Sequence, residues 1–175
     1  MIRLIACVFV LAACAVRTPI NQVAISEVKQ HLKYKNVVFR NFTAAPGVKS
    51  PEAPLIACRR SAVEYLELKN IFKVVEKDNG KSYEEPTMFV DVILTNLRIV
   101  GGAARFWLGV MVGRSNMNIK VKLTDADGLL IAEKELIGAP NAYSSAFSFG
   151  SADRSLPEKM GFLLGDFILA NVSEK

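Results

Sequence analysis

The stretch from Asn116 to Ile137 constrains the fold most. Apolar and polar residues alternate from 116 to 125, so that Met117, Ile119, Val121 and Leu123 share one side. An Asp-Ala-Asp-Gly turn signal at 125–128 follows, and then a second run from 129 to 137. Strict alternation is typical of antiparallel strands with one buried and one solvent-facing side. The sequence therefore predicts a β-hairpin whose apolar side must be covered by another part of the chain.

The polar side of this hairpin carries four charges. Pairing across the turn places Lys120 and Lys122 on the same face as Glu133 and Glu135. Cross-strand ion pairs of this kind contribute about 0.2–1 kcal/mol each. The lysines explain the two glutamates as an ordered sheet surface, so we do not interpret them as a catalytic carboxylate pair.

Other segments predict more strands and two helices. The expected strands cover residues 34–43, 71–76 and 87–100, and the last of these is apolar on both sides, which is typical of a central strand. A helix is predicted over residues 51–70, because apolar residues recur there at helical spacing. They form a stripe that is expected to be buried: Leu55, Cys58, Ala62 and Leu66. A capping box at 155–158 predicts the start of a last helix. Its expected buried face consists of Met160, Leu163, Leu164, Phe167 and Ile168. The pattern favours an α+β fold, in which both helices pack on one face of a mostly antiparallel sheet.

The chemistry-bearing residues are sparse. The chain of 175 residues has one histidine, His31, and only Cys58 remains as an internal cysteine once the N-terminal segment is set aside. No nucleophile elbow and no metal-ligand spacing occurs, so we expect no catalytic residues, no metal and no cofactor. The net charge of +5 becomes +4 without Arg3, since residues 1–13 hold no acidic residue. This mild excess does not predict a nucleic-acid partner.

The N-terminus has the layout of an export signal. Arg3 precedes an apolar run at 4–10, and Leu-Ala-Ala-Cys follows at 11–14. This motif resembles the lipobox of bacterial lipoproteins, which implies that Cys14 receives a diacylglycerol and becomes the first mature residue. We therefore expect a signal peptide at 1–13, a lipidated cysteine and tether at 14–33, and a single domain at 34–175. The alternative is ordinary signal cleavage after Ala15. An uncleaved anchor is disfavoured because a spanning helix needs about 20 apolar residues.

The resemblance also implies a location. Lipoproteins with Asp after the lipidated cysteine tend to stay in the inner membrane, and this chain has Ala15 there. We expect a lipid-anchored protein of the cell envelope, at the outer membrane and facing the periplasm.

A glycine-punctuated apolar segment, residues 101–115, lies between two predicted strands. We favour the interpretation that it is a crossover whose glycines supply positive φ and whose apolar residues cap the core. The alternative is a contact patch for a membrane or a partner, made of Arg105, Phe106, Trp107 and Arg114. A membrane-inserting hairpin is disfavoured by the lysines and the arginine of the flanking strands.

The same segment carries a family resemblance. The chain has an Arg-aromatic-x-x-Gly-x-x-x-Gly pattern at 105–113, an alternating strand, an Asp-Ala-x-Gly turn, and an opening strand at 35–39. Together these resemble a broad family of bacterial envelope lipoproteins whose domain has no assigned function. Members often have Thr or Ser where this chain has Asp127. The resemblance implies a small α+β domain with no known catalytic residues, and it supplies no substrate.

Three functions remain from the sequence. The first is a non-enzymatic envelope lipoprotein that acts in binding or assembly, with a membrane contact through the lipid on Cys14 and an envelope protein as partner. The second is an accessory subunit of an export or secretion machine. The third, a hydrolase of cell-wall or lipid substrates, is disfavoured by the missing catalytic groups.

Overall fold

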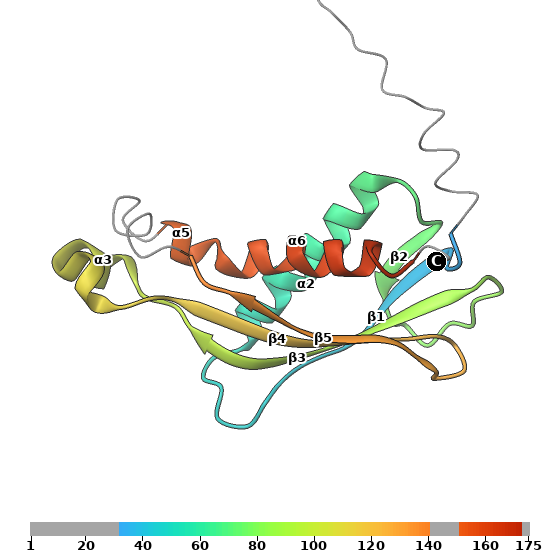
Figure 1. Ribbon diagram of the computed structural model, residues 1–175, viewed down its shortest axis with the longest axis horizontal. Coiled ribbons are helices and arrows are strands. Elements are labelled where there is room, and N and C mark those ends of the chain that lie inside the picture. The colour runs from blue at the N-terminus through green and yellow to red at the C-terminus, as the bar shows by residue number, and fades with distance from the viewer. Residues whose placement is uncertain (1–31, 141–150, 173–175) are drawn as a thin grey trace, which may run out of the picture.

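The computed structural model describes residues 32–140 and 151–172, apart from the side chain of Arg105. A five-stranded sheet forms one layer, and two long helices cover one of its faces (Figure 1). The predicted α+β fold class is thus confirmed. The signal peptide, Cys14, most of the expected tether and His31 lie outside the described residues.

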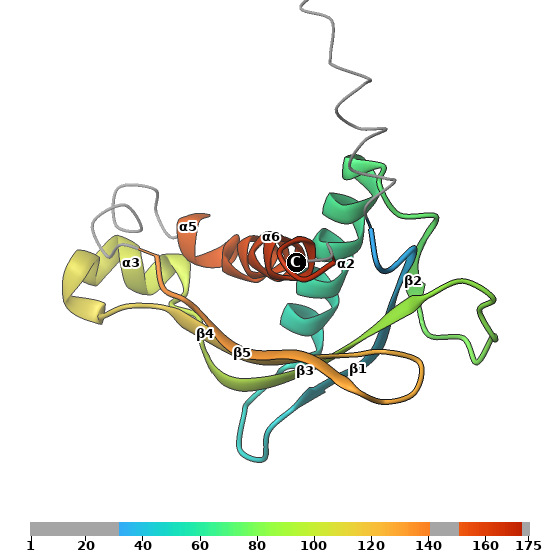
Figure 2. The same cartoon turned by 45° about the vertical axis from the view of Figure 1, so that its right-hand side comes forward.

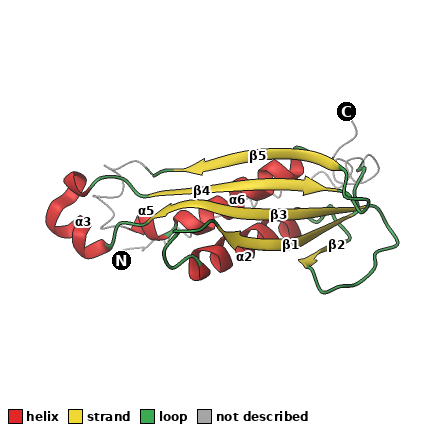
Figure 3. Ribbon diagram, turned by 90° about the horizontal axis from the view of Figure 1, so that it is seen from below, coloured by secondary structure: helices red, strands yellow, loops and turns green. Residues whose placement is uncertain are grey.

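The sheet has the strand order β2-β1-β3-β4-β5. Its strands are β1 (Asn36–Ala44), β2 (Val74–Lys77), β3 (Thr87–Arg98), β4 (Asn116–Thr124) and β5 (Leu130–Gly138). The longest pairings are antiparallel and join β3 to β4 and β4 to β5. β1 runs parallel to both of its neighbours, β2 and β3 (Figure 3). As the apolar run at 87–100 predicts, β3 is the central strand.

The predicted hairpin has the expected register. Lys120 lies opposite Glu135, and Lys122 lies opposite Glu133, on the face of the sheet that carries no helix. Lys120 forms a diagonal ion pair with Glu133, with 2.5 Å between Nζ and Oε1. The other side of the hairpin is the core, where Met117, Ile119, Val121 and Leu123 are fully buried.

The helical layer consists of α2 (Glu52–Lys69) and α6 (Leu156–Leu169), which cross above the sheet (Figure 2). The predicted stripe of α2 is buried in full. In α6, Met160, Leu164 and Ile168 are buried, whereas Leu163 is exposed. The buried face of α6 is therefore narrower than its sequence suggests.

The capping box predicted at the start of α6 is wrong. A short helix, α5 (Ser151–Arg154), leads directly into α6, and the Ser155 amide donates to the Ser151 carbonyl. The Ser155 hydroxyl donates back to Ala152 O at 3.3 Å and makes no cap. A helix that continues from another helix has no free N-terminal amides for a cap to satisfy.

Two glycines of α6 bring the helices together. A Cβ at Gly161 would overlap the Cys58 carbonyl oxygen, and one at Gly165 would overlap the Tyr65 ring. From the sequence alone, glycines at this spacing would be expected to let the last helix approach the sheet closely. In the structure they allow close approach to α2 instead.

Candidate functional site

The segment between β3 and β4 forms a helical tip, which we define as residues 102–112. It consists of α3 (Gly102–Leu108) and a 3-10 helix, η1 (Gly109–Val112). The two pack on each other at one end of the elongated molecule (Figures 1 and 3). The sequence predicted a loop here, but Ala, Arg and Leu favour a helical turn. Gly109 at φ +53° and Gly113 at φ +90° provide the backbone reversals after α3 and η1.

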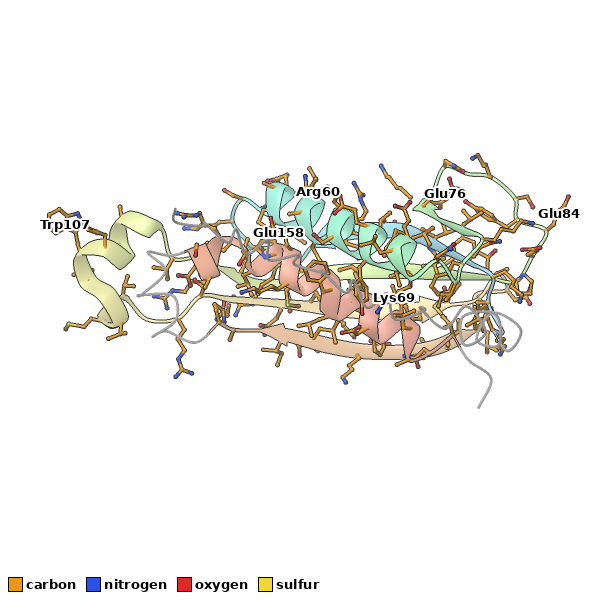
Figure 4. All side chains as sticks on the ribbon, turned by 90° about the horizontal axis from the view of Figure 1, so that it is seen from above. Arg60, Lys69, Glu76, Glu84, Trp107 and Glu158 are labelled. Atoms are coloured by element: carbon orange, nitrogen blue, oxygen red, sulfur yellow. The ribbon has the colours of Figure 1, made fainter. Side chains whose placement is uncertain are left out.

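The tip exposes large apolar side chains. Trp107 is 80% exposed and Met111 is 88% exposed, and Trp107 points away from the body of the molecule (Figure 4). The other exposed apolar residues of the tip are Phe106, Leu108 and Val110. The interpretation of this segment as a core cap is therefore wrong, because the tip projects past the ends of the strands (Figure 1) and none of its described side chains belongs to the hydrophobic core.

The base of the tip is fixed to the sheet. Arg98 Nη2 donates to the Val112 carbonyl at 3.0 Å, and the Val100 amide donates to the buried Ser115 hydroxyl at 2.9 Å. Within the tip, the rings of Phe106 and Trp107 meet edge to face with centroids 5.2 Å apart. An anchored base and ordered rings present the apolar side chains as a defined surface.

The charge around the tip has one sign. The sequence has no Asp or Glu from Val92 to Thr124, but it has Arg98, Arg105 and Arg114. Arg114 is exposed, whereas the side chain of Arg105 lies outside the described residues. The tip is thus an apolar surface within a stretch of chain that carries only positive charge.

The uncovered face of the sheet holds a second polar cluster. A β-bulge after Phe39 brings Arg40 and Asn41 to Asp91 of β3, at 2.5 Å and 2.6 Å respectively. Burial raises the pKa of Asp91, but hydrogen bonds from Arg40 and Asn41 outweigh this effect and hold that pKa below its usual value. The cluster is a satisfied structural ion pair.

The remaining predicted residues do not form a reactive site. Cys58 is fully buried, and burial, with the nearby Glu158 charge, raises the pKa of its thiol to about 12. Within residues 32–140 and 151–172, no group of three or more His, Cys, Asp or Glu is placed to hold a metal ion. No helix in those ranges is long and apolar enough to cross a membrane.

Comparison with known proteins assigns the chain to a family of proteins that share one domain. The family described as Domain of unknown function (DUF4410) matches residues 55–173, from within the first turn of α2 to just beyond α6. The chain belongs to this family. A search of curated proteins finds no match.

Two solved structures have a similar fold. One is a leucine-to-methionine variant of the PelC dodecamer from Paraburkholderia phytofirmans, with a TM-score of 0.53 and 11% identity over 82% of this chain and 91% of that one. The other is a PelC dodecamer from the same organism, with a TM-score of 0.49 and 12% identity over 76% and 88%. At these identities the likeness shows the fold alone.

Proposed function

We propose that the protein is a lipid-anchored bacterial envelope lipoprotein that acts as a non-enzymatic binding or assembly module through its helical tip. The observation that carries this proposal is the set of large apolar side chains exposed at the tip. Contiguous apolar patches on a protein surface mark interaction sites. The lipobox-like motif at 11–14 supplies the membrane address.

The chemistry of the tip fits the interface of a lipid bilayer. Trp and Phe concentrate at the headgroup level of membranes, and Arg is attracted to anionic headgroups. Trp107 and Phe106 would anchor the contact, with Arg98 and Arg114 near the phosphates. The tip is then a second membrane contact beside the lipid on Cys14.

A two-part attachment has a physical rationale. Each buried CH₂ of a lipid chain contributes about 0.8 kcal/mol, so the two chains of a diacylglycerol hold the protein at the membrane but do not fix how the domain is oriented there. A weak protein contact is strengthened when an anchor already holds the protein at the surface, because the second binding event becomes intramolecular. The tip would set the orientation of the domain, and the lipid would supply most of the affinity.

The second candidate function is a subunit of an envelope export assembly. It is favoured by the fold that the chain shares with PelC, whose solved form is a dodecamer. In that case the tip would contact another protein of the assembly instead of lipid.

The anchor is tested with Cys14→Ser. The variant should lose labelling by an alkyne fatty acid and should leave the membrane fraction. Equal membrane retention of the variant and the wild type would overturn the lipoprotein proposal.

The tip is tested by fluorescence, because Trp107 is the only tryptophan. In the full-length Cys14→Ser variant, its emission should be red-shifted in buffer and should move to the blue with vesicles that contain phosphatidylglycerol. Met111→Ser should weaken vesicle binding, whereas Leu129→Ser, an exposed apolar residue outside the tip, should not. No spectral change with vesicles, together with photocrosslinks from position 107 to an envelope protein, would favour the export subunit instead.

A further inference from the structure

The outer edge of β1 is only half covered. β2 pairs with Asn36–Phe39, and the last bond on that side joins the Asp78 amide to the Phe39 carbonyl. On its other side β1 stays paired with β3 as far as Ala44. Residues 40–44 therefore form an open edge, with no strand beside it among the described elements.

The open edge presents backbone groups in a known direction. The Ala45 amide donates to the Leu94 carbonyl of β3, at 2.9 Å, so Ala45 faces inward. Backbone groups of successive residues in a parallel ladder point to opposite sides. The backbone groups of Ala44 and Phe42 consequently face outward, as a template for an added strand.

An apolar groove lies beside this edge. It has a volume of about 440 Å³, and its walls come from the end of β1 and the first half of α2. Its lining includes Phe42, Ala44, Leu55, Ile56 and Arg59. Ile56 is 56% exposed on the α2 wall. An added strand would turn every second side chain into this groove.

Arg59 gives the groove a charge preference. Its guanidinium stacks over the Phe42 ring, with 5.6 Å from Cζ to the ring centroid, and it has no ion-pair partner in the described chain. Its neighbour Arg60 differs, since it pairs with Glu64 at 3.8 Å and lies on the outer side of α2 (Figure 4). A guanidinium held by a ring keeps its N–H donors free for a carboxylate. Glu52, in the first turn of α2, is the acidic residue of the lining.

We propose that the open edge of β1 is a docking site for an extended, apolar segment of a partner protein that carries an acidic side chain. The segment adds as a strand beside Phe42 and Ala44. One of its apolar side chains packs on Leu55 and Ile56, and its carboxylate pairs with Arg59. This mode is β-augmentation, in which main-chain hydrogen bonds give affinity and alternate side chains give specificity. The proposal is independent of the lipid anchor and of the tip.

The test uses a defined probe. The fluorescein-labelled peptide Ser-Val-Thr-Val-Thr-Asp-Thr-Ser, whose valines and aspartate share one face of an extended strand, is titrated against full-length Cys14→Ser protein, and binding is followed by anisotropy. Ile56→Asp and Arg59→Glu should each weaken binding at least tenfold. The matched controls on the same helix are Leu68→Asp, at a residue 83% exposed, and Arg60→Glu, and both should bind as the parent does.

A charge swap separates the specific contact from a loss of fold. A peptide with Lys in place of Asp should bind the parent protein weakly and the Arg59→Glu variant tightly. N-methylation of every second peptide residue should abolish binding in one of the two possible alternations and not in the other, because only one edge of the added strand faces β1. Absence of peptide binding at millimolar concentration, equal losses in the control variants, or no charge-swap rescue would overturn the proposal. Oligomers of the parent that Ile56→Asp dissociates would also overturn it, since a second copy would then occupy the edge.

Discussion

Gly161→Ala tests the close approach of α6 to the backbone of α2. The added Cβ would overlap the Cys58 carbonyl oxygen and would lie 2.7 Å from Ser61 Cβ and 2.9 Å from the Ala62 amide nitrogen. Two of these three neighbours belong to the backbone of α2, which cannot rotate away. The helices must therefore move apart, and the shift disturbs the core beneath them.

The expected cost follows from two opposing effects. Overpacking of a filled core costs about 1–3 kcal/mol, and rigid backbone neighbours place this site at the upper end. Replacing glycine by alanine inside a helix returns about 1 kcal/mol. We expect a net loss of about 2 kcal/mol, which lowers the melting temperature by about 6 °C at about 3 °C per kcal/mol.

Urea unfolding followed by circular dichroism measures this loss, and the midpoint should fall while the m-value stays unchanged. Gly165→Ala is the matched control, because its new Cβ meets the ring of Tyr65, a side chain that can turn aside. It should cost clearly less. A Gly161→Ala variant as stable as the parent, or more stable, would refute the close packing of α2 on α6.

Three further predictions follow from burial and charge. Cys58 should react with thiol reagents slowly in the native protein and quickly in urea, because burial raises its pKa to about 12; fast labelling of native protein would contradict its place in the core. The folded pKa of Asp91 lies below its unfolded value, so its contribution to stability is complete above about pH 4 and is lost as the pH falls through the folded pKa. Asp91→Asn should therefore flatten the acid limb of a stability-versus-pH curve, and an unchanged limb would show that the pair with Arg40 is not formed. Trp107→Ala should change the free energy of unfolding by less than about 0.5 kcal/mol, as at an exposed site, whereas a loss of about 3–5 kcal/mol would mean that the tip is packed in solution.

The antiparallel pairing of β3, β4 and β5 could be predicted because the sequence signals that determine it lie close together along the chain. Alternation fixes which side of β4 faces the core, and the turn at 125–128 fixes the register with β5. The place of β1 between β2 and β3 could not be predicted in the same way. Parallel neighbours are joined by long connections, so no short turn in the sequence shows which strands pair.

The tip shows where sequence patterns are ambiguous. An apolar segment with glycines has the same composition whether it covers a core or projects into solvent. The absence of acidic residues from Val92 to Thr124 was a usable signal for an exposed contact surface. A segment that only covers a core does not need neighbouring residues of a single positive charge. The position of Arg59 over the Phe42 ring could not be predicted, because it depends on the bulge in β1, and no turn or glycine signal in the sequence marks that bulge.

The placement of β1 also bears on where the folding unit begins. The family match starts at residue 55, inside α2, yet β1 precedes it and fills the gap between β2 and β3. A fragment cut at the family boundary would lack Val37 and Phe39, two fully buried side chains, and would leave β2 without a neighbour. The loop after Ala44 is then a suitable place to divide the chain into two fragments. Each fragment alone would have an incomplete sheet, so the full sheet would form only when the two fragments associate. The shortest autonomous folding unit should thus begin before β1, whereas the family match covers only part of that unit.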